Sequence, residues 1–110
     1  MNVITLIGRL TNDPEIRWTQ NENAVANFVM AVDRATKEKE TDFIPCTAFR
    51  HNAEFMERNC YKGQRVAVQG KLQIQRYEKD GENKTYAKVL VYTLEPMEWK
   101  NEAEKVSPFD

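Results

Sequence analysis

Aromatic rings at the spacing of a β-strand are the side chains of this sequence best suited to chemistry. An extended chain would point Phe43 and Phe49 to one face and the smaller Cys46 and Ala48 to the other. If the smaller set fills a core, the two rings lie outside, where nucleobases could stack on them at about 1–3 kcal/mol each. The residues alone leave the opposite orientation, with both rings in the core, about equally open. Pro45 cannot donate to a ladder and is expected at an edge or a bulge.

A second outward set follows along the next long strand, alternating with the apolar Leu72 and Ile74. Its members are Lys71, Gln73, Gln75 and Tyr77. With the two phenylalanines, this set predicts a surface of rings, hydrogen-bonding amides and cations, which suits an unpaired nucleic-acid strand. Cations between the rings would neutralise phosphates, so affinity would arise without sequence reading. Taken singly, the lysines and arginines could equally be solubilising charges.

The sequence contains no recognisable catalytic or metal-binding constellation. His51 is the only histidine, and its spacing suggests no serine or cysteine partner, so we expect a surface or capping role. Cys46 and Cys60 match no zinc spacing and are expected to be buried thiols. The four glycines are scattered singly and form no phosphate-binding loop. We therefore predict a protein that is not an enzyme and uses no metal and no cofactor.

The elements that must position these side chains are mostly strands. Alternation and turn residues predict strands over residues 3–10, 25–33, 42–50, 65–75 and 85–92, with a short piece over 15–19. Residues 34–40 are a charged loop, residues 51–61 change to helical spacing, and Gly70 marks a bend or bulge. Asp80-Gly81 predicts a hairpin turn. The order predicts an all-β, five-stranded barrel with one short helix between strands 3 and 4.

Length and charge limit what this barrel could do. A chain of 110 residues has room for one domain, which we place at residues 1–99, with residues 100–110 as a short flexible end. Residues 1–94 carry a net charge of +2 and residues 95–110 carry −3, so the mildly basic body permits nucleic-acid binding without requiring it. No stretch approaches the roughly 20 apolar residues of a membrane span, and no leader follows Met1. We expect a cytoplasmic, nucleoid-associated protein with no membrane partner.

Several spaced motifs resemble the bacterial single-stranded DNA-binding proteins. The run GRLTNDPEIRW, from Gly8 to Trp18, is similar to the opening of that family. Further similar segments follow in the family's order at residues 25–28, 42–50, 53–54, 61–63 and 68–72. The resemblance covers residues 1 to about 95. It implies an oligonucleotide/oligosaccharide-binding (OB) fold, a homotetramer, and DNA that runs over the outer strands and loops.

The resemblance also implies roles for particular residues. Phe43 and Phe49 match stacking positions on the third strand, and Tyr77 matches an aromatic position on the fourth. Trp18 stands where tyrosine is usual. Two roles are equally open for it, packing against the barrel and contact with a base. The predicted nucleic-acid-binding residues are Phe43, Phe49, Tyr77, Trp18, Arg34, Arg50, Lys71, Gln73, Gln75 and Arg76.

Some positions depart from the family pattern. Gln73 and Gln75 stand where arginine is common, so we expect weaker binding and a shallower salt dependence than in a typical member. A tryptophan that some members carry after the second strand has no counterpart in residues 34–42. Members usually end in a long linker and an acidic tip finishing Pro-Phe, whereas Ser107-Pro108-Phe109-Asp110 follows almost directly on the barrel. We expect a reduced or missing ability to contact replication or repair proteins through this end.

The sequence thus predicts non-specific binding and protection of single-stranded DNA in replication, recombination or repair. The alternative is an interaction module of the primosomal type, an OB dimer that mainly contacts other replication proteins. Binding of oligo-dT separates the two readings.

Overall fold

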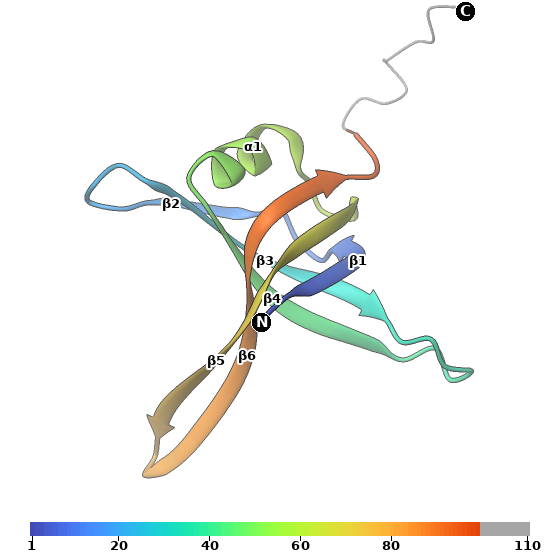
Figure 1. The fold of residues 1–110 in the computed structure, drawn as a ribbon, viewed down its shortest axis with the longest axis vertical. Helices are drawn as coiled ribbons and strands as arrows, with labels where there is room; N and C mark the ends of the chain where they lie inside the picture. The colour runs from blue at the N-terminus through green and yellow to red at the C-terminus, as the bar shows by residue number, and fades with distance from the viewer. Residues whose placement is uncertain (100–110) are drawn as a thin grey trace, which may run out of the picture.

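The computed structural model describes residues 1–99, and the predicted flexible end at residues 100–110 lies outside the described residues. The predicted domain boundary at this point therefore stays a prediction. Six strands and one helix follow in the order β1 (Ile4–Leu10), β2 (Glu15–Trp18), β3 (Ala24–Asp33), β4 (Thr41–Phe49), α1 (His51–Asn59), β5 (Arg65–Lys79) and β6 (Glu82–Pro96) (Figure 1).

The strands close into a barrel. β1, β5, β6, β4 and β3 pair in this order, and the pairing of β1 with β3 completes the ring, while β2 pairs with β3 from outside it. Every pair is antiparallel except β4 with β6. The predicted five-stranded OB barrel, with its helix after the third long strand, is confirmed.

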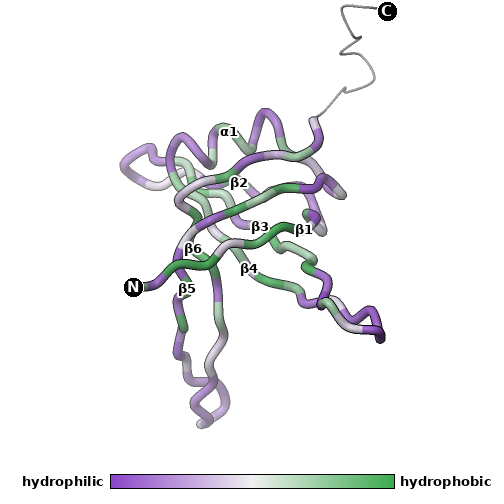
Figure 2. Tube along the Cα trace, turned by 45° about the vertical axis from the view of Figure 1, so that its right-hand side comes forward, coloured by the Kyte–Doolittle hydropathy of each residue, from purple (hydrophilic) through white to green (hydrophobic). Residues whose placement is uncertain are grey.

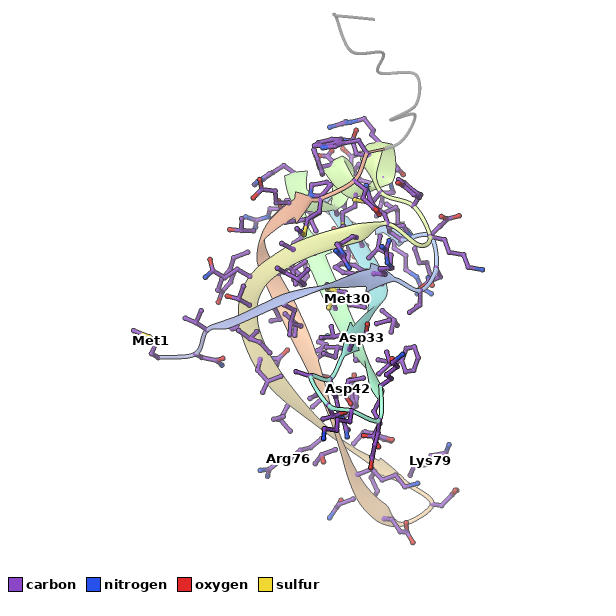
Figure 3. The ribbon with its side chains drawn as sticks, turned by 90° about the vertical axis from the view of Figure 1, so that its right-hand side faces the viewer. Met1, Met30, Asp33, Asp42, Arg76 and Lys79 are labelled. Atoms are coloured by element: carbon purple, nitrogen blue, oxygen red, sulfur yellow. The ribbon has the colours of Figure 1, made fainter. Side chains whose placement is uncertain are left out.

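The core is built from the inward half of each alternating strand. On β3 and β4 the buried side chains include Phe28, Met30 and Cys46, and Met56 joins them from α1. Met30 lies inside the barrel in Figure 3. Both cysteines are buried, as predicted, and burial raises the pKa of the Cys46 thiol to about 12.

The β5–β6 hairpin extends beyond the barrel as a long arm, and the β3–β4 hairpin extends as a shorter one (Figure 1). Their tips are hydrophilic, whereas the barrel strands are mostly hydrophobic (Figure 2). Leu72 and Ile74 lie on the long arm with their side chains on the same side as the core, because Leu72 pairs with the buried Val89. They are nonetheless 40% and 55% exposed, because β1 covers β5 only as far as Gly70.

The irregularity predicted at Gly70 occurs there, but the extra residue belongs to the partner strand. Gln69 pairs with Thr93 and Gly70 pairs with Val91, so Tyr92 of β6 has no opposite residue. The bulge reverses the alternation of β6 at this point. Strands β5 and β6 also run longer than predicted, because their pairing continues to Lys79 and Glu82 at the tip of the arm.

Two local expectations have different outcomes. Pro45 lies where one side of β4 is unpaired, because the pairing with β6 covers only Cys46 and Thr47, and this agrees with the predicted edge position. The helix, in contrast, ends earlier than predicted. Its C-cap is Cys60, and Gly63, with a φ of 88°, lies in the turn that follows rather than at the cap.

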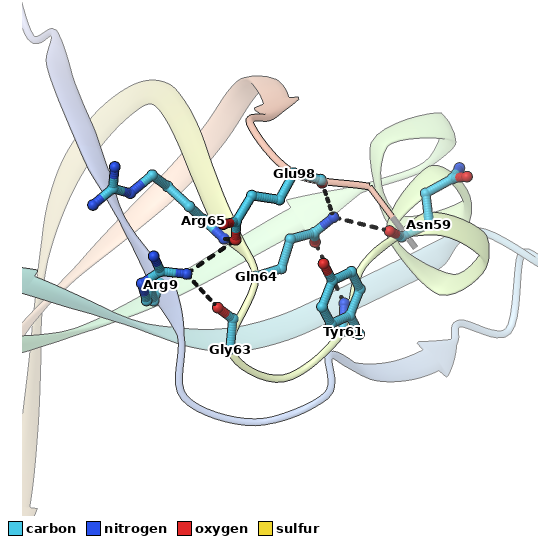
Figure 4. Close-up of polar contacts among 7 residues, drawn as sticks. All are labelled: Arg9, Asn59, Tyr61, Gly63, Gln64, Arg65 and Glu98. Carbon is cyan, nitrogen blue, oxygen red and sulfur yellow. Dashed lines mark hydrogen bonds and ion pairs between the residues drawn. The ribbon is translucent and has the colours of Figure 1, made fainter. Parts of the chain in front are cut away.

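A polar network fastens the chain after β6 to the barrel (Figure 4). The fully buried Gln64 donates from Nε2 to the backbone carbonyls of Asn59 and Glu98, at 3.1 and 2.6 Å. The Glu98 carboxylate in turn accepts from Arg9 Nη1 and from the backbone N–H of Arg65, both at 3.0 Å. The amide of Gln64 is thus satisfied inside the fold, and the network joins β1, β5 and the segment after β6.

Candidate nucleic-acid interface

The orientation of β4 determines which side chains face solvent. Phe43 is 66% exposed and Phe49 is 42% exposed, while Cys46 and Ala48 between them are buried in the core. Cross-strand pairing with β3 sets this arrangement, since Phe43 lies opposite Ala31 and Phe49 opposite Val25 on the outward side. The structure therefore decides between the two orientations that the sequence left open, and places both rings outside.

The outward side of β4 continues across β6 onto β5. Cys46 pairs with Val89, and both are buried, so their neighbours Thr47 and Leu90 share the opposite side of the sheet. Because β6 pairs with β5 along the whole long arm, the same side extends to Tyr77. We call this surface the outer face; its residues are Phe43, Pro45, Thr47 and Phe49 of β4, Lys84, Tyr86, Lys88 and Leu90 of β6, and Lys71, Gln73, Gln75 and Tyr77 of β5.

Two shallow depressions mark the outer face near β4. One, of about 280 Å³, is lined by Asn27, Pro45, Tyr86 and Lys88, among others. Its polar lining includes Asn27, whose Oδ1 accepts a 3.0 Å hydrogen bond from the Thr47 hydroxyl. The second, of about 420 Å³, lies beside Phe49. Tyr86 and Phe49 thus stand next to hollows that also hold hydrogen-bonding groups.

Two tyrosines form a ring pair on the long arm. Tyr77 and Tyr86 meet edge to face, with centroids 5.8 Å apart and planes at 62°. Tyr86 Oη also donates to Gln75 Oε1 at 3.4 Å, and Gln75 Nε2 donates to Gln73 Oε1 at 3.1 Å. Both tyrosines are 43% exposed. The predicted position of Tyr77 outside the barrel is found, and its partner Tyr86 adds a second ring there.

The predicted cations do not all lie on the outer face. Lys71 lies there and is half-buried. Arg76 pairs with Thr85 and shares its side of the arm with Leu72 and Ile74, so it faces away from Tyr77. Figure 3 shows Arg76 on the arm beyond the barrel. The family resemblance placed Arg76 on the same path as Lys71, whereas the alternation of β5 puts these two side chains on opposite sides of the arm.

Arg34 is already bound by carboxylates. Its guanidinium forms ion pairs with Asp42, at 2.9 Å, and with Glu40. The hydrogen bonds that Arg34 donates to the Asp42 carboxylate hold the pKa of Asp42 below its ordinary value, and the same bonds raise the pKa of Arg34. The charge of this predicted nucleic-acid-binding residue is therefore balanced within the protein.

Trp18 and Arg50 occupy different surroundings. Trp18 is 54% exposed, but it pairs with Ala24 of β3, on the side of the sheet that carries the buried Ala26. It therefore points away from the side that carries Phe49. Arg50 is exposed, precedes α1 with a φ of 56°, and lines the depression beside Phe49. Of the two, only Arg50 lies next to a ring of the outer face.

Sequence reasoning missed several residues of this surface, among them Tyr86, Lys88 and Asn27. Tyr86 and Lys88 lie on the outer face, and Asn27 lines its first depression. Lys84, Tyr86 and Lys88 are spaced two residues apart and lie out of phase with the buried Val89. This spacing is the same signal that identified the outward set on β5. Applied to β6, it could have found the first two.

Two further features are absent from the part of the chain that the structure describes. Residues 1–99 contain no group of three or more His, Cys, Asp or Glu side chains arranged to hold a metal ion. Within the same range, no helix has both the length and the hydrophobicity needed to cross a membrane.

Comparison with known proteins points to one family. Residues 1–97 match the profile of the single-strand binding protein family. The chain is 41% identical over 106 residues to a single-stranded DNA-binding protein of Bacillus cereus, covering 92% of this chain and 62% of the relative. It is 39% identical to single-stranded DNA-binding protein A of Bacillus subtilis, with the same two coverages. Single-stranded DNA-binding protein B of Bacillus subtilis is 39% identical over 104 residues, with 90% of this chain and 92% of the relative covered. The chain thus spans less than two thirds of the length of the first two relatives.

Proposed function

Because the chain belongs to the single-strand binding protein family, we propose that it binds single-stranded DNA without reading its sequence. Bases would stack on the rings of the outer face, and cations beside the rings would neutralise the phosphates between them. The proposal includes no catalytic step.

One observation carries this proposal: the rings of β4 and of the long arm lie on one continuous side of the sheet. All four rings are well exposed: Phe43, Phe49, Tyr77 and Tyr86. Exposure of such apolar surface to water is unfavourable in an isolated protein. Parallel pairing of Cys46 with Val89 joins the two groups without a break. A polynucleotide lying along this side could therefore stack successive bases on rings from three strands.

The polar groups of the outer face suit the rest of a nucleotide. Lys84 and Lys88 lie on β6, and Lys71 and the glutamines lie beside them on β5. Few of the predicted cations act here, because Arg34 is paired with acids and Arg76 faces the other way. We therefore expect stacking to supply a larger share of the affinity than phosphate neutralisation, with a shallow dependence on salt.

Titration with oligo-dT tests the proposal. The wild type should bind the oligonucleotide, as measured by the change in tyrosine and tryptophan fluorescence or by anisotropy of a labelled strand. Phe43→Ala and Phe49→Ala should each weaken binding by about 1–3 kcal/mol, the usual value of one base–aromatic stack. A duplex of the same length is the control, because its bases are not available to the rings. Equal affinity for duplex and single strand would contradict the proposal.

We also propose that the protein works in replication, recombination or repair and assembles as a homotetramer. The exposed apolar side chains away from the outer face support assembly, since Val3, just before β1, and Ile7 on β1 are more than half exposed. Sedimentation equilibrium tests the tetramer, and a monomer at micromolar concentration would contradict it. The segment expected to contact partner proteins lies outside the described residues, so its role stays a prediction.

The alternative function, a module that mainly contacts other replication proteins, is tested by the same titration. Such a module would not need exposed rings on a continuous face, and it would leave oligo-dT unbound at moderate salt. Weak or absent binding of oligo-dT, together with capture of purified replication proteins, would favour it over the proposal.

A further inference from the structure

A charged clasp closes the β3–β4 hairpin immediately before Phe43. Arg34 Nε and Nη2 donate to the Asp42 carboxylate at 3.1 and 2.9 Å, and Nη1 donates to the Glu40 carboxylate. The backbone N–H of Arg34 also donates to the Glu40 carbonyl at 2.8 Å. One arginine thus bridges two acids and ties the end of β3 to the start of β4.

A second contact at the same place supports the clasp. Thr41 Oγ1 donates to Asp33 Oδ1 at 2.9 Å, across the last residue pair of the ladder. Figure 3 shows Asp33 and Asp42 on this arm, away from the core residue Met30. The hairpin end is therefore held by side-chain contacts as well as by backbone pairing.

Phe43 has little else to hold it in position. It pairs with Ala31, whose methyl group offers a small contact, and among the described residues no other ring packs against it. On its other edge β4 is unpaired here, because β6 joins β4 only at Cys46 and Thr47. The direction of the Phe43 ring consequently depends on the geometry of the hairpin that the clasp closes.

We propose that Arg34 is a positioning residue, whose fork on Asp42 and Glu40 fixes the hairpin end that presents the Phe43 ring to a base. The inference rests on the proposed binding of single-stranded DNA. It gives a specific role to Arg34, which the sequence predicted only as a nucleic-acid-binding residue. The planar guanidinium suits this task, because its donors can reach two carboxylates at once, which a single ammonium group cannot do in the same geometry.

A positioning role for the clasp and a purely electrostatic role predict opposite changes in the DNA affinity of one variant. Asp42→Asn removes a negative charge beside the path of a polyanion, so charge alone would tighten binding. If the clasp positions Phe43, the same variant opens the clasp and weakens binding. Arg34→Lys keeps the charge and loses the fork, so it too should weaken binding.

The experiment measures oligo-dT affinity at two salt concentrations for the wild type, Asp42→Asn, Arg34→Lys and Lys37→Gln. Lys37→Gln is the matched control, because it removes a cation from the same loop and no contact of Lys37 takes part in the clasp. We expect Asp42→Asn and Arg34→Lys each to weaken binding about fivefold, the upper range for an exposed ion-pair network. Lys37→Gln should change affinity less, and the salt dependence of Arg34→Lys should match that of the wild type.

A double-mutant cycle shows whether the clasp acts through Phe43. In a Phe43→Ala background, Asp42→Asn should cost nothing further, because the ring that the clasp positions is gone. Thermal unfolding of each variant, followed by circular dichroism, separates this effect from loss of the fold. Unchanged or tighter binding by Asp42→Asn, or additive losses in the cycle, would overturn the inference. If the wild type itself does not bind oligo-dT, the proposed function fails instead.

Discussion

Gly70 and Leu90 approach so closely that a β-carbon on Gly70 would lie 1.9 Å from the Leu90 carbonyl oxygen. The approach occurs beside the bulge at Tyr92, where β6 changes the side on which its residues face the core. Since the obstructing atom belongs to the backbone, a side chain at this position would have to move the strand pair itself. The glycine is therefore required by the way in which the long arm leaves the barrel.

Gly70→Ala should lower the free energy of unfolding by about 2 kcal/mol or more, because the added methyl group overpacks a site bounded by backbone. Urea denaturation followed by circular dichroism measures the change. Gly81→Asn is a suitable control: Gly81 has a φ of 78° with nothing near its missing β-carbon, and asparagine tolerates this conformation. Equal stabilities of Gly70→Ala and the wild type would show that the strand pair yields at no cost.

Trp18 and Phe49 should differ in their effect on binding, although both are exposed aromatic residues. The pairing of β2 with β3 places Trp18 on the side of the sheet opposite to Phe49. Phe49→Ala should therefore weaken oligo-dT binding by about 1–3 kcal/mol, and Trp18→Ala should weaken it by much less. Anisotropy of a labelled oligonucleotide measures both affinities. Losses of equal size would mean that the strand wraps around both sides of the sheet.

Lys88 and Arg76 should differ in their effect on salt dependence. Lys88 lines the depression of the outer face, while Arg76 lies on the other side of the arm. Lys88→Gln should reduce the slope of log K against log salt by about 0.7, the value of one phosphate contact to a single strand, and Arg76→Gln should leave it nearly unchanged. Titrations at four salt concentrations give the slopes. A reduced slope for Arg76→Gln alone would place the backbone on the opposite side.

The stability of the barrel should depend on pH through Glu98. A hydrogen bond from the backbone N–H of Arg65 is the main cause that lowers the pKa of Glu98 below its ordinary value, with Arg9 adding to it. A carboxylate with a lowered pKa in the folded state stabilises the fold at neutral pH. That stabilisation is lost as the pH falls below about 4.3, the ordinary value, through the lower folded pKa.

Urea denaturation of the wild type and Glu98→Gln over this pH range checks the prediction. The wild type should be the more stable protein at pH 7, and the difference should shrink as the carboxylate becomes protonated. A difference in the free energy of unfolding that stays constant down to pH 3 would mean that the ionisation of Glu98 does not contribute.

Much of the architecture was readable from the sequence because period-two alternation is a local property. The strands follow from it, while the helix after the third long strand follows from a local change to helical spacing and the hairpin from the turn residues Asp80-Gly81. The outward set on β5 from Lys71 to Tyr77 was predicted in the correct phase. The same alternation puts Arg76, which only the family resemblance had placed on this path, on the other side of the arm, and it could have identified Tyr86 and Lys88.

By itself, then, the sequence determined which residues share a face, and the tertiary structure decided which face meets solvent. Alternation sets Phe43 and Phe49 against Cys46 and Ala48, but only the closure of the ring around the second pair makes it the core. Likewise the exposure of Leu72 and Ile74 depends on β1 ending its pairing at Gly70, a contact between strands far apart in the chain. Burial is a relation between distant segments, so no local pattern contains it.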